Sequence, residues 1–444
     1  MLGSAGTGKT VVAMHRARWL AQNVAVEPDQ RVLFTTFTHN LAADIRANLE
    51  KLCRPEQLGR IDVAHLHGWA HDYLRKAGVD FQIVYDEHKL REAWEVAMTR
   101  AEPSLNLEEP FYRAEWTEIV VANGIRDEET YLRVPRTGRG VRLNRLQRKQ
   151  VWPVFDAFRA ELERRRWKDG DEALLHAAEM LAKGDPAAAR YRSVVVDEAQ
   201  DLSGPALRLI RALVPAQAND LFLVGDGHQR IYRRRIAMSK FGIDIRGRGR
   251  RLRINYRTTE EIRRFAMAVL DGVPIDDLDG GAVKFGPETS LLHGIKPVTE
   301  TYGDADAEMA AAIEHVKALV ASGAADSEIC ITARTNRAVE SIKRALDNAG
   351  MTSHELRRTT ADERRKSGVR IGTMHRIKGL EFDHVLVVGA GSDTIPYPAA
   401  LLVDDELSRR EAEWRERALL YVAGTRGRRS LRITATGRLN DLIR

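Results

Sequence analysis

The order of apolar and polar residues predicts alternating helices and short buried strands in the first half of the chain. Residues 11–23 place apolar side chains at helical spacing, and the run 31–37 that follows is apolar and β-branched. Two further apolar runs, 194–196 and 221–224, each end in polar residues. Strands that alternate with helices in this way favour parallel sheets with crossover helices.

The second half of the chain repeats this alternation. Residues 298–323 predict a strand and a helix, and residues 327–350 predict a strand, a loop and a helix. Two strands around a polar turn are expected in 369–389, and a helix followed by a strand in 417–434. The stretch 270–297 is dense in Gly, Asp and Pro, which favours a boundary between the two halves.

Length and composition narrow the class of protein. A chain of 444 residues is long enough for two to four domains, and it has no apolar run of membrane length. No signal peptide is visible, and the two cysteines have no metal-like spacing, so we expect a cytoplasmic protein. The net charge of +7 fits a polyanion partner, although an arginine excess set by genome composition explains it equally well.

The first candidate for chemistry is the stretch GSAGTGKT at residues 3–10, which matches the pattern of a phosphate-binding loop. In such a loop backbone N–H groups converge on phosphate oxygens, Lys9 adds a positive charge, and the Thr10 hydroxyl can bind Mg²⁺. The helix that follows directs its positive dipole end at the same phosphates. An ordinary glycine turn is the alternative. Only Met1 and Leu2 precede the loop, so we expect its supporting strand to be missing.

Two acidic residues and an amide follow the next buried strands. Asp197 and Glu198 directly follow the run 194–196, at the sheet edge where α/β folds bind ligands. Asp197 is expected to hold Mg²⁺, and Glu198 to orient or deprotonate a water. Gln229 follows the next strand and can sense a terminal phosphate. Together with the glycine loop, these residues predict a nucleoside triphosphatase.

Eight stretches, taken in order, resemble the motifs of superfamily-one helicases of the UvrD/Rep/PcrA type. They are GSAGTGKT (motif I), FTTFTHNLAADI (Ia), DVAHLHGWA (Ib), VVVDEAQD (II), LVGDGHQRIY (III), LRINYRTTEEI (IV), TMHRIKGLEF (V) and LLYVAGTRGRRSL (VI). The resemblance runs over nearly the whole chain. It implies an α/β fold of two tandem RecA-like P-loop NTPase domains with parallel sheets, and a mostly helical insert in the first domain.

The resemblance also implies domain boundaries. The first RecA-like, ATP-binding domain is expected in 1–73 and 191–272, without its amino-terminal strand, and the helical insert in 74–190. The second RecA-like domain is expected in 273–444, with little or no accessory insert. The family's adenine-contacting glutamine lies upstream of the phosphate loop and is not in this sequence. We therefore expect either a fragment or an internal start.

Carried over residue by residue, the resemblance implies the following roles. ATP is expected to contact the loop residues Gly3, Ser4, Ala5, Gly6, Thr7, Gly8, Lys9 and Thr10, with Tyr256 near the base and Glu381 at the ribose. Mg²⁺ is expected at Thr10 and Asp197, and catalytic roles at Glu198, Gln229, Arg257 and Arg426. DNA contacts are expected from Thr35, Phe37, Thr38, Asn40, His65, His67, Tyr232, Arg234, Thr373 and His375. Arg234 stands where the family usually has a base-stacking aromatic residue.

The implied function is an ATP-dependent DNA helicase or translocase that moves on single-stranded DNA, 3′ to 5′, with ATP and Mg²⁺. The expected partner is a single strand, with or without an adjoining duplex, and the free protein is expected to be a monomer outside any membrane. One alternative is a translocase that does not unwind, or the motor part of a nuclease or defence complex. Another is a nucleic-acid-binding fragment without ATPase activity.

Overall fold

The structure of the chain is a computed structural model. It describes residues 1–443 except 37–38, 85–86, 137–138, 140, 185–190, 232–236, 276–277, 279–280, 282–287, 358–365 and 403–405, and except the side chains of residues 39, 40 and 87. The predicted DNA contacts Phe37, Thr38, Tyr232 and Arg234, and the side chain of Asn40, therefore lie outside the described residues. Within the described part of the chain, every helix is too short or too polar to cross a membrane.

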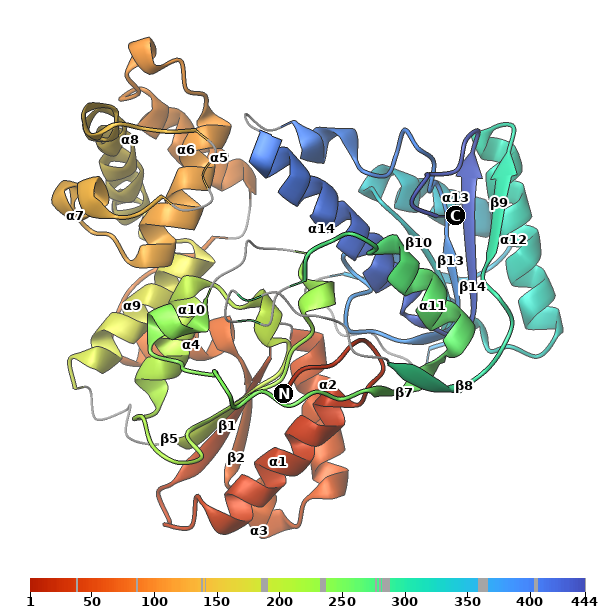
Figure 1. Ribbon diagram of the computed structural model, residues 1–444, viewed down its shortest axis with the longest axis horizontal. Coiled ribbons are helices and arrows are strands. Elements are labelled where there is room, and N and C mark those ends of the chain that lie inside the picture. Colours follow the sequence, from red (N-terminus) through yellow and green to blue (C-terminus); the bar gives the residue numbers. More distant parts are fainter. Residues whose placement is uncertain are drawn as a thin grey trace.

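A parallel four-stranded sheet forms the centre of the first lobe (Figure 1). Its strands are β2 (Ile61–His65), β1 (Arg31–Thr36), β5 (Tyr191–Val196) and β6 (Leu221–Leu223), in this spatial order. The strands β1 and β5 are buried along most of their length because helices cover both faces of the sheet. One face carries α1 (Lys9–Asn23), α2 (His39–Leu52) and α3 (Pro55–Leu58), and the other carries α4 (Leu66–Lys76), α9 (Gly170–Ala182) and α10 (Gly204–Leu213).

The first three residues run beside β6, in the place of the strand that leads into a phosphate loop. Leu2 forms parallel bridges with Gly225 on one side and Arg251 on the other. Two backbone hydrogen bonds, 2.7 and 2.8 Å long, join Leu2 to the segment 250–252. The ammonium group of Met1 donates to a carbonyl of β6 at 2.8 Å. The expectation that this strand is missing is thus corrected in part, because its last residues are present and bonded on both sides.

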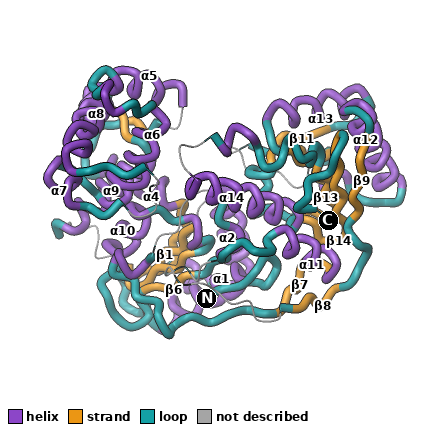
Figure 2. The backbone as a smooth tube through the Cα atoms, turned by 45° about the horizontal axis from the view of Figure 1, so that its top comes forward, coloured by secondary structure: helices purple, strands orange, loops and turns teal. Residues whose placement is uncertain are grey.

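The chain between α4 and α9 forms a helical unit with its own core, which lies to one side of both helices (Figures 1 and 2). Trp94, Trp116 and Trp152 are buried in this core, and the ring of Trp94 stacks on Phe158 with centroids 3.9 Å apart. The unit contains α5 (Glu87–Met98), α6 (Glu109–Glu115), the π-helix Trp116–Val121, α7 (Glu128–Arg133) and α8 (Arg145–Arg164), with the short pair β3 (Gln82–Ile83) and β4 (Trp167–Lys168).

The second lobe is built on a parallel sheet of six strands. Their spatial order is β11 (Ser353–Glu355), β12 (Val369–Thr373), β10 (Ile329–Ala333), β13 (Phe382–Val387), β14 (Gly427–Thr436) and β9 (Val298–Tyr302). Helices α12 (Ala305–Ala321) and α13 (Asn336–Asn348) pack in one core with this sheet, and α11 (Glu260–Val269) and α14 (Glu406–Gly424) pack in another. The two parallel sheets confirm the predicted fold class.

The polypeptide crosses from the first lobe to the second through β7 (Ile254–Thr259), which pairs with β8 (Thr289–Leu292). Directly after this strand, Ile262 and Ala266 of α11 join the same core as Leu419 of α14. The domain boundary after residue 272 stays a prediction, and α11, which precedes it, shares this core with α14. The predicted nucleotide residues Asp197, Glu198, Asp226 and Gln229 follow β5 and β6, at the carboxyl ends of the first lobe's strands.

Candidate nucleotide site between the lobes

The phosphate loop has the backbone conformation that its glycines permit. Gly6 and Gly8 have φ angles of 81° and 79°, in the left-handed region that other residues adopt only with strain. A Cβ atom built on Gly8 meets nothing within 4 Å, whereas one built on Gly6 lies 2.4 Å from Asn255 Oδ1. The loop is thus open above Gly8, at the start of α1, and closely packed beneath Gly6.

The polar groups next to the loop form a donor set that fits a phosphate and a divalent cation. The Thr10 hydroxyl donates to Asp197 Oδ2 at 2.7 Å, so two hard oxygen ligands suited to Mg²⁺ lie side by side. Lys9 Nζ donates to the Ser4 carbonyl at 2.8 Å and lies 3.7 Å from Asp226 Oδ2. The ammonium group thus lies at the loop and beside a buried carboxylate.

The two acidic residues after β5 differ in environment. Asp197 is buried, and burial together with the adjacent Glu198 raises its pKa to about 7. Glu198 has a left-handed backbone, with φ 55° and ψ 41°, which is uncommon outside glycine and asparagine. The Gln200 amide donates to its carboxylate. The turn therefore directs the two neighbouring carboxyl groups to different partners.

Asp226 and Gln229, after β6, connect the loop to the second lobe. Asp226 Oδ2 accepts from Gln229 Nε2 at 2.8 Å. Burial alone would raise the pKa of Asp226, but Lys9 and His228 outweigh it and hold the pKa well below the usual range. The other end of the Gln229 amide, Oε1, accepts from Arg426 Nη2 at 3.0 Å.

The second lobe contributes Arg426, and the crossing strand β7 contributes Arg257. Arg426 is 2% exposed, and burial, followed by the charge of Arg257, lowers its pKa to about 10, so it stays charged at neutral pH. Arg257 donates to Glu381 Oε1 at 2.7 Å and to the Thr425 carbonyl at 3.1 Å. Predicted residues from both halves of the chain are therefore brought together around one site.

Backbone and side-chain contacts from β7 hold the loop itself. Asn255 Nδ2 donates to the Ala5 carbonyl at 2.9 Å, and the backbone N–H of Tyr256 donates to the Gly6 carbonyl at 2.9 Å. The Tyr256 side chain is 59% exposed next to this contact. The sequence patterns gave Asn255 no role, because its partner is 250 residues away along the chain.

Lys378 is another functional candidate that sequence reasoning missed. It lies in the motif that follows β12, in the second lobe, yet its Nζ donates to Asp201 Oδ2 at 2.5 Å and to the Gln229 carbonyl at 2.6 Å in the first lobe. Both side chains of this ion pair are nearly inaccessible, with exposures of 6% and 0%. Burial raises the pKa of Asp201 to about 6, although Lys378 opposes this shift.

The predicted DNA contacts that the structure describes lie at strand ends in both lobes. Thr35 is buried near the end of β1, and His65 ends β2 with its ring stacked on that of His67 at a centroid distance of 5.1 Å. Thr373 ends β12, and His375 follows it. Burial and then Arg334 lower the pKa of His375 to about 4, so this ring is neutral at pH 7.

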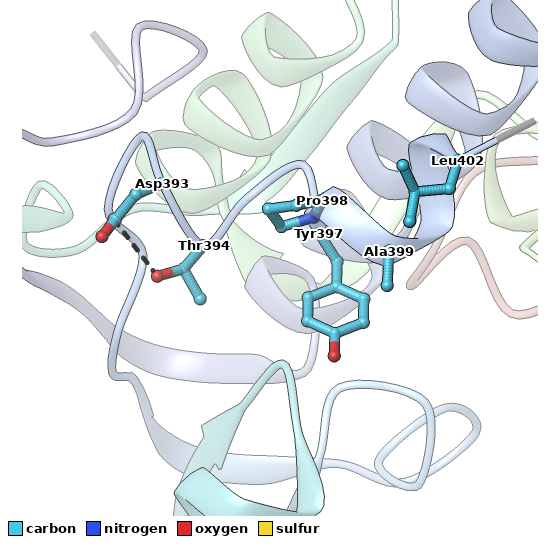
Figure 3. A pocket seen from close by; sticks show the side chains of 6 residues that line it. All are labelled: Asp393, Thr394, Tyr397, Pro398, Ala399 and Leu402. Carbon is cyan, nitrogen blue, oxygen red and sulfur yellow. Dashed lines mark hydrogen bonds between the residues drawn. The ribbon is translucent and has the colours of Figure 1, made fainter.

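A separate pocket of about 480 Å³ lies on the second lobe, in the segment between β13 and α14 (Figure 3). It is lined by Asp393, Thr394, Tyr397, Pro398, Ala399 and Leu402. The guanidinium of Arg334 lies 4.7 Å from the centroid of the Tyr397 ring and forms a bidentate ion pair with Glu416. None of the residues predicted to bind nucleotide or DNA is among those that line it.

Comparison with known proteins places the chain in a family. A model described as the UvrD/REP helicase N-terminal domain matches residues 1–243, and one described as the UvrD-like helicase C-terminal domain matches residues 349–438. The ATP-dependent DNA helicase UvrD2 of Mycobacterium tuberculosis is 28% identical over 372 residues, which cover 79% of this chain and 52% of that protein.

Two further relatives resemble the chain over different lengths. DNA helicase II of Escherichia coli is 30% identical over 295 residues, with 61% of this chain and 38% of that protein covered. A probable DNA helicase of Mycoplasma pneumoniae is 25% identical over 448 residues, with 96% and 78% covered. The chain spans about half the length of the UvrD2 relative. With two parallel-sheet lobes, a phosphate loop between them and matching family models in both halves, the chain belongs to the UvrD/REP helicase family.

Proposed function

We propose that this protein hydrolyses ATP between its two lobes and uses the reaction to move 3′ to 5′ along single-stranded DNA. The observation that carries the proposal is the contact of Gln229 with both lobes. Its amide joins Asp226, which lies beside Lys9 of the loop, to Arg426 of the second lobe, in the turn between α14 and β14. A change at a terminal phosphate is thereby linked to the relative position of the lobes.

The residues present fit ATP and Mg²⁺ as substrate and cofactor. The loop is open above Gly8, Lys9 lies in it, and the hydroxyl of Thr10 and the carboxylate of Asp197 are adjacent oxygen ligands. These two side chains would hold the ion, and Lys9 with the backbone N–H groups of the loop would hold the phosphates. When bound, Mg²⁺ neutralises part of the charge on the phosphate oxygens.

The chemical step is assigned to side chains of this chain. Glu198 accepts a hydrogen bond from, or the proton of, the attacking water, because it lies one residue beyond Asp197. Arg257 and Arg426 offset the negative charge that grows on the phosphoryl oxygens, where a planar guanidinium binds two oxygens at once. Arg257 Nη1 donates to Glu381, the carboxylate assigned to the ribose, so these two proposed nucleotide contacts lie side by side.

Movement follows from the arrangement of the contacts. The lobes meet through Arg426, Lys378 and Arg257, and β7 connects them covalently. Closing and opening of two lobes around a ligand is a common conformational change. A strand bound across the ends of β1, β2 and β12 would contact both lobes and be drawn along by their relative motion.

The chemistry is tested by DNA-stimulated ATP hydrolysis under steady-state conditions. Lys9→Ala and Glu198→Gln are expected to abolish turnover while binding of a fluorescent single strand persists. The matched controls are Lys343→Ala and Glu340→Gln, which change exposed side chains of α13 and are expected to keep wild-type rates. Unchanged turnover in either site variant would contradict the assignment, and absence of turnover in the wild type would favour a nucleic-acid-binding protein without ATPase activity.

Movement and unwinding need separate substrates. The single strands carry streptavidin on a biotin at one end. Movement from 3′ to 5′ displaces streptavidin from the 5′ end and leaves streptavidin on the 3′ end in place. On a forked duplex, a helicase releases the partner strand, whereas a translocase that does not unwind leaves it in place. Displacement from the 3′ end alone would overturn the proposed polarity.

A further inference from the structure

His228 lies beside the nucleotide site without a role in the chemistry proposed above. It is 4% exposed, and its Nδ1 lies 2.5 Å from Asp226 Oδ1. The second oxygen of this carboxylate, Oδ2, accepts from Gln229 Nε2 at 2.8 Å and lies 3.7 Å from Lys9 Nζ. His228 therefore holds one oxygen of the carboxylate whose other oxygen faces two residues of the site.

The ring of His228 is itself held by the second lobe. It stacks on the ring of Tyr421 of α14, with centroids 5.6 Å apart and planes at 29°. Tyr421 is 1% exposed, and its hydroxyl accepts a hydrogen bond from the backbone N–H of Ala5 in the phosphate loop at 3.3 Å. One tyrosine of the second lobe thus contacts both the loop and the histidine behind Asp226.

We propose that His228 and Tyr421 are positioning residues, which set Asp226 and the phosphate loop according to the position of the second lobe. This inference rests on the proposed ATP hydrolysis. Lys9 exchanges its contact with the Asp226 carboxylate for contacts with the phosphates. The position of Asp226 therefore determines how readily the Lys9 ammonium group is released. The same carboxylate fixes the Gln229 amide with its oxygen towards Arg426.

The geometry separates three contributions that substitutions can distinguish: the hydrogen bond of His228 to Asp226, its stack on Tyr421, and the hydrogen bond of Ala5 to Tyr421. The hydrogen bond from His228 to Asp226 needs a nitrogen donor near the Nδ1 position, which asparagine supplies and leucine does not. The stack on Tyr421 needs an aromatic ring, which phenylalanine retains. The hydrogen bond from Ala5 needs the hydroxyl, which phenylalanine lacks. A role in packing alone predicts that leucine and asparagine at position 228 behave alike, or that leucine is better tolerated.

The test measures two quantities for His228→Leu, His228→Asn, Tyr421→Phe and Tyr421→Leu. The first is the affinity for adenylyl imidodiphosphate with Mg²⁺ by calorimetry, and the second is DNA-stimulated kcat and KM for ATP. His228→Leu is expected to lower kcat about tenfold, the effect typical of losing one hydrogen bond to a charged group, and His228→Asn to restore most of it. Tyr421→Phe is expected to weaken analogue binding about fivefold with kcat nearly unchanged, since a single neutral hydrogen bond is lost. Tyr421→Leu is expected to lower both the affinity for the analogue and kcat.

The outcomes are distinct. If the wild type binds the analogue but does not turn ATP over, the proposed function fails, and the affinity series still decides the inference. If turnover is normal in His228→Leu, or if His228→Asn is no better than His228→Leu at equal melting temperature, the inference is overturned. A wild type that binds no analogue overturns both.

Discussion

The ion pair between Lys378 and Asp201 gives the most direct test of how the lobes are joined. Lys378→Met keeps an unbranched side chain, one heavy atom shorter, and removes its charge. The Asp201 carboxylate, which is 0% exposed, then loses this cationic partner. Removing one partner of a buried pair typically costs about 3–5 kcal/mol. Asp201 can avoid part of this cost by taking up a proton. Its pKa is already raised to about 6, and protonation one pH unit above the pKa costs only about 1.4 kcal/mol. We therefore expect a loss near the lower end, about 3 kcal/mol.

The assay is the melting temperature of the whole chain at pH 7.5 and pH 5.5. A loss of about 3 kcal/mol lowers the melting temperature of a domain of this size by roughly 6–12 °C. The loss should be smaller at pH 5.5, where Asp201 is mostly protonated in the wild type and Lys378 stabilises it less. Lys378→Met combined with Asp201→Asn should recover most of the loss at pH 7.5, since no charge is then buried alone.

The matched control is Lys317→Met, which removes an exposed pair with Glu314 and is expected to cost less than about 1 kcal/mol. The reasoning is refuted if Lys378→Met lowers the melting temperature equally at both pH values. A double variant as unstable as Lys378→Met would refute it as well, because the loss would then not come from the uncompensated carboxylate.

Three other substitutions test separate features. Gly6→Ala should impair nucleotide binding and lower the melting temperature, because the new Cβ would lie 2.4 Å from Asn255 Oδ1 at a positive φ; wild-type analogue affinity would contradict this. Burial raises the pKa of Asp169 to about 7, so the stabilising contribution of its protonated form is present below pH 4 and is lost as the pH rises through 7. Asp169→Asn should therefore raise the melting temperature at pH 8 but not at pH 5. An equal change at both pH values would refute the raised pKa. Arg426→Lys should lower kcat about a hundredfold with a small change in KM, because lysine cannot both hold Gln229 and bridge two oxygens; a loss confined to KM would exclude a role in the transition state.

The strands and the loop were predictable because their signals are local. The run 194–196 is apolar without interruption since β5 is buried on both faces, and the glycines of the loop mark backbone angles that few other residues adopt. The prediction began three residues late, because Tyr191 and Ser193 of the same strand carry hydroxyl groups. The order of the motifs then indicated two RecA-like domains, as the two parallel sheets confirm.

Contacts between distant segments were not predictable in the same way. Lys378 and Asp201 are 177 positions apart, and Ala5 and Tyr421 are 416 positions apart, so no periodicity or spacing connects them. The expectation that the strand before the loop is missing arose for another reason. Two residues are too few to show a strand pattern, and only the structure reveals that Leu2 forms parallel bridges to neighbours on both sides. The roles assigned to the DNA-contacting residues remain predictions.

The contacts around the phosphate loop have a consequence for dissecting this protein. Ala5 and Gly6 are held through Asn255 and Tyr256 of the crossing strand and through Tyr421 near the end of the chain. A fragment that stops before β7 would contain every residue of the glycine motif but none of these three supports. The loop of this fragment would lose conformational entropy when it becomes ordered around the nucleotide, so the fragment would bind nucleotide with lower affinity. We therefore expect the proposed nucleotide site to reach its full affinity only in the complete pair of lobes.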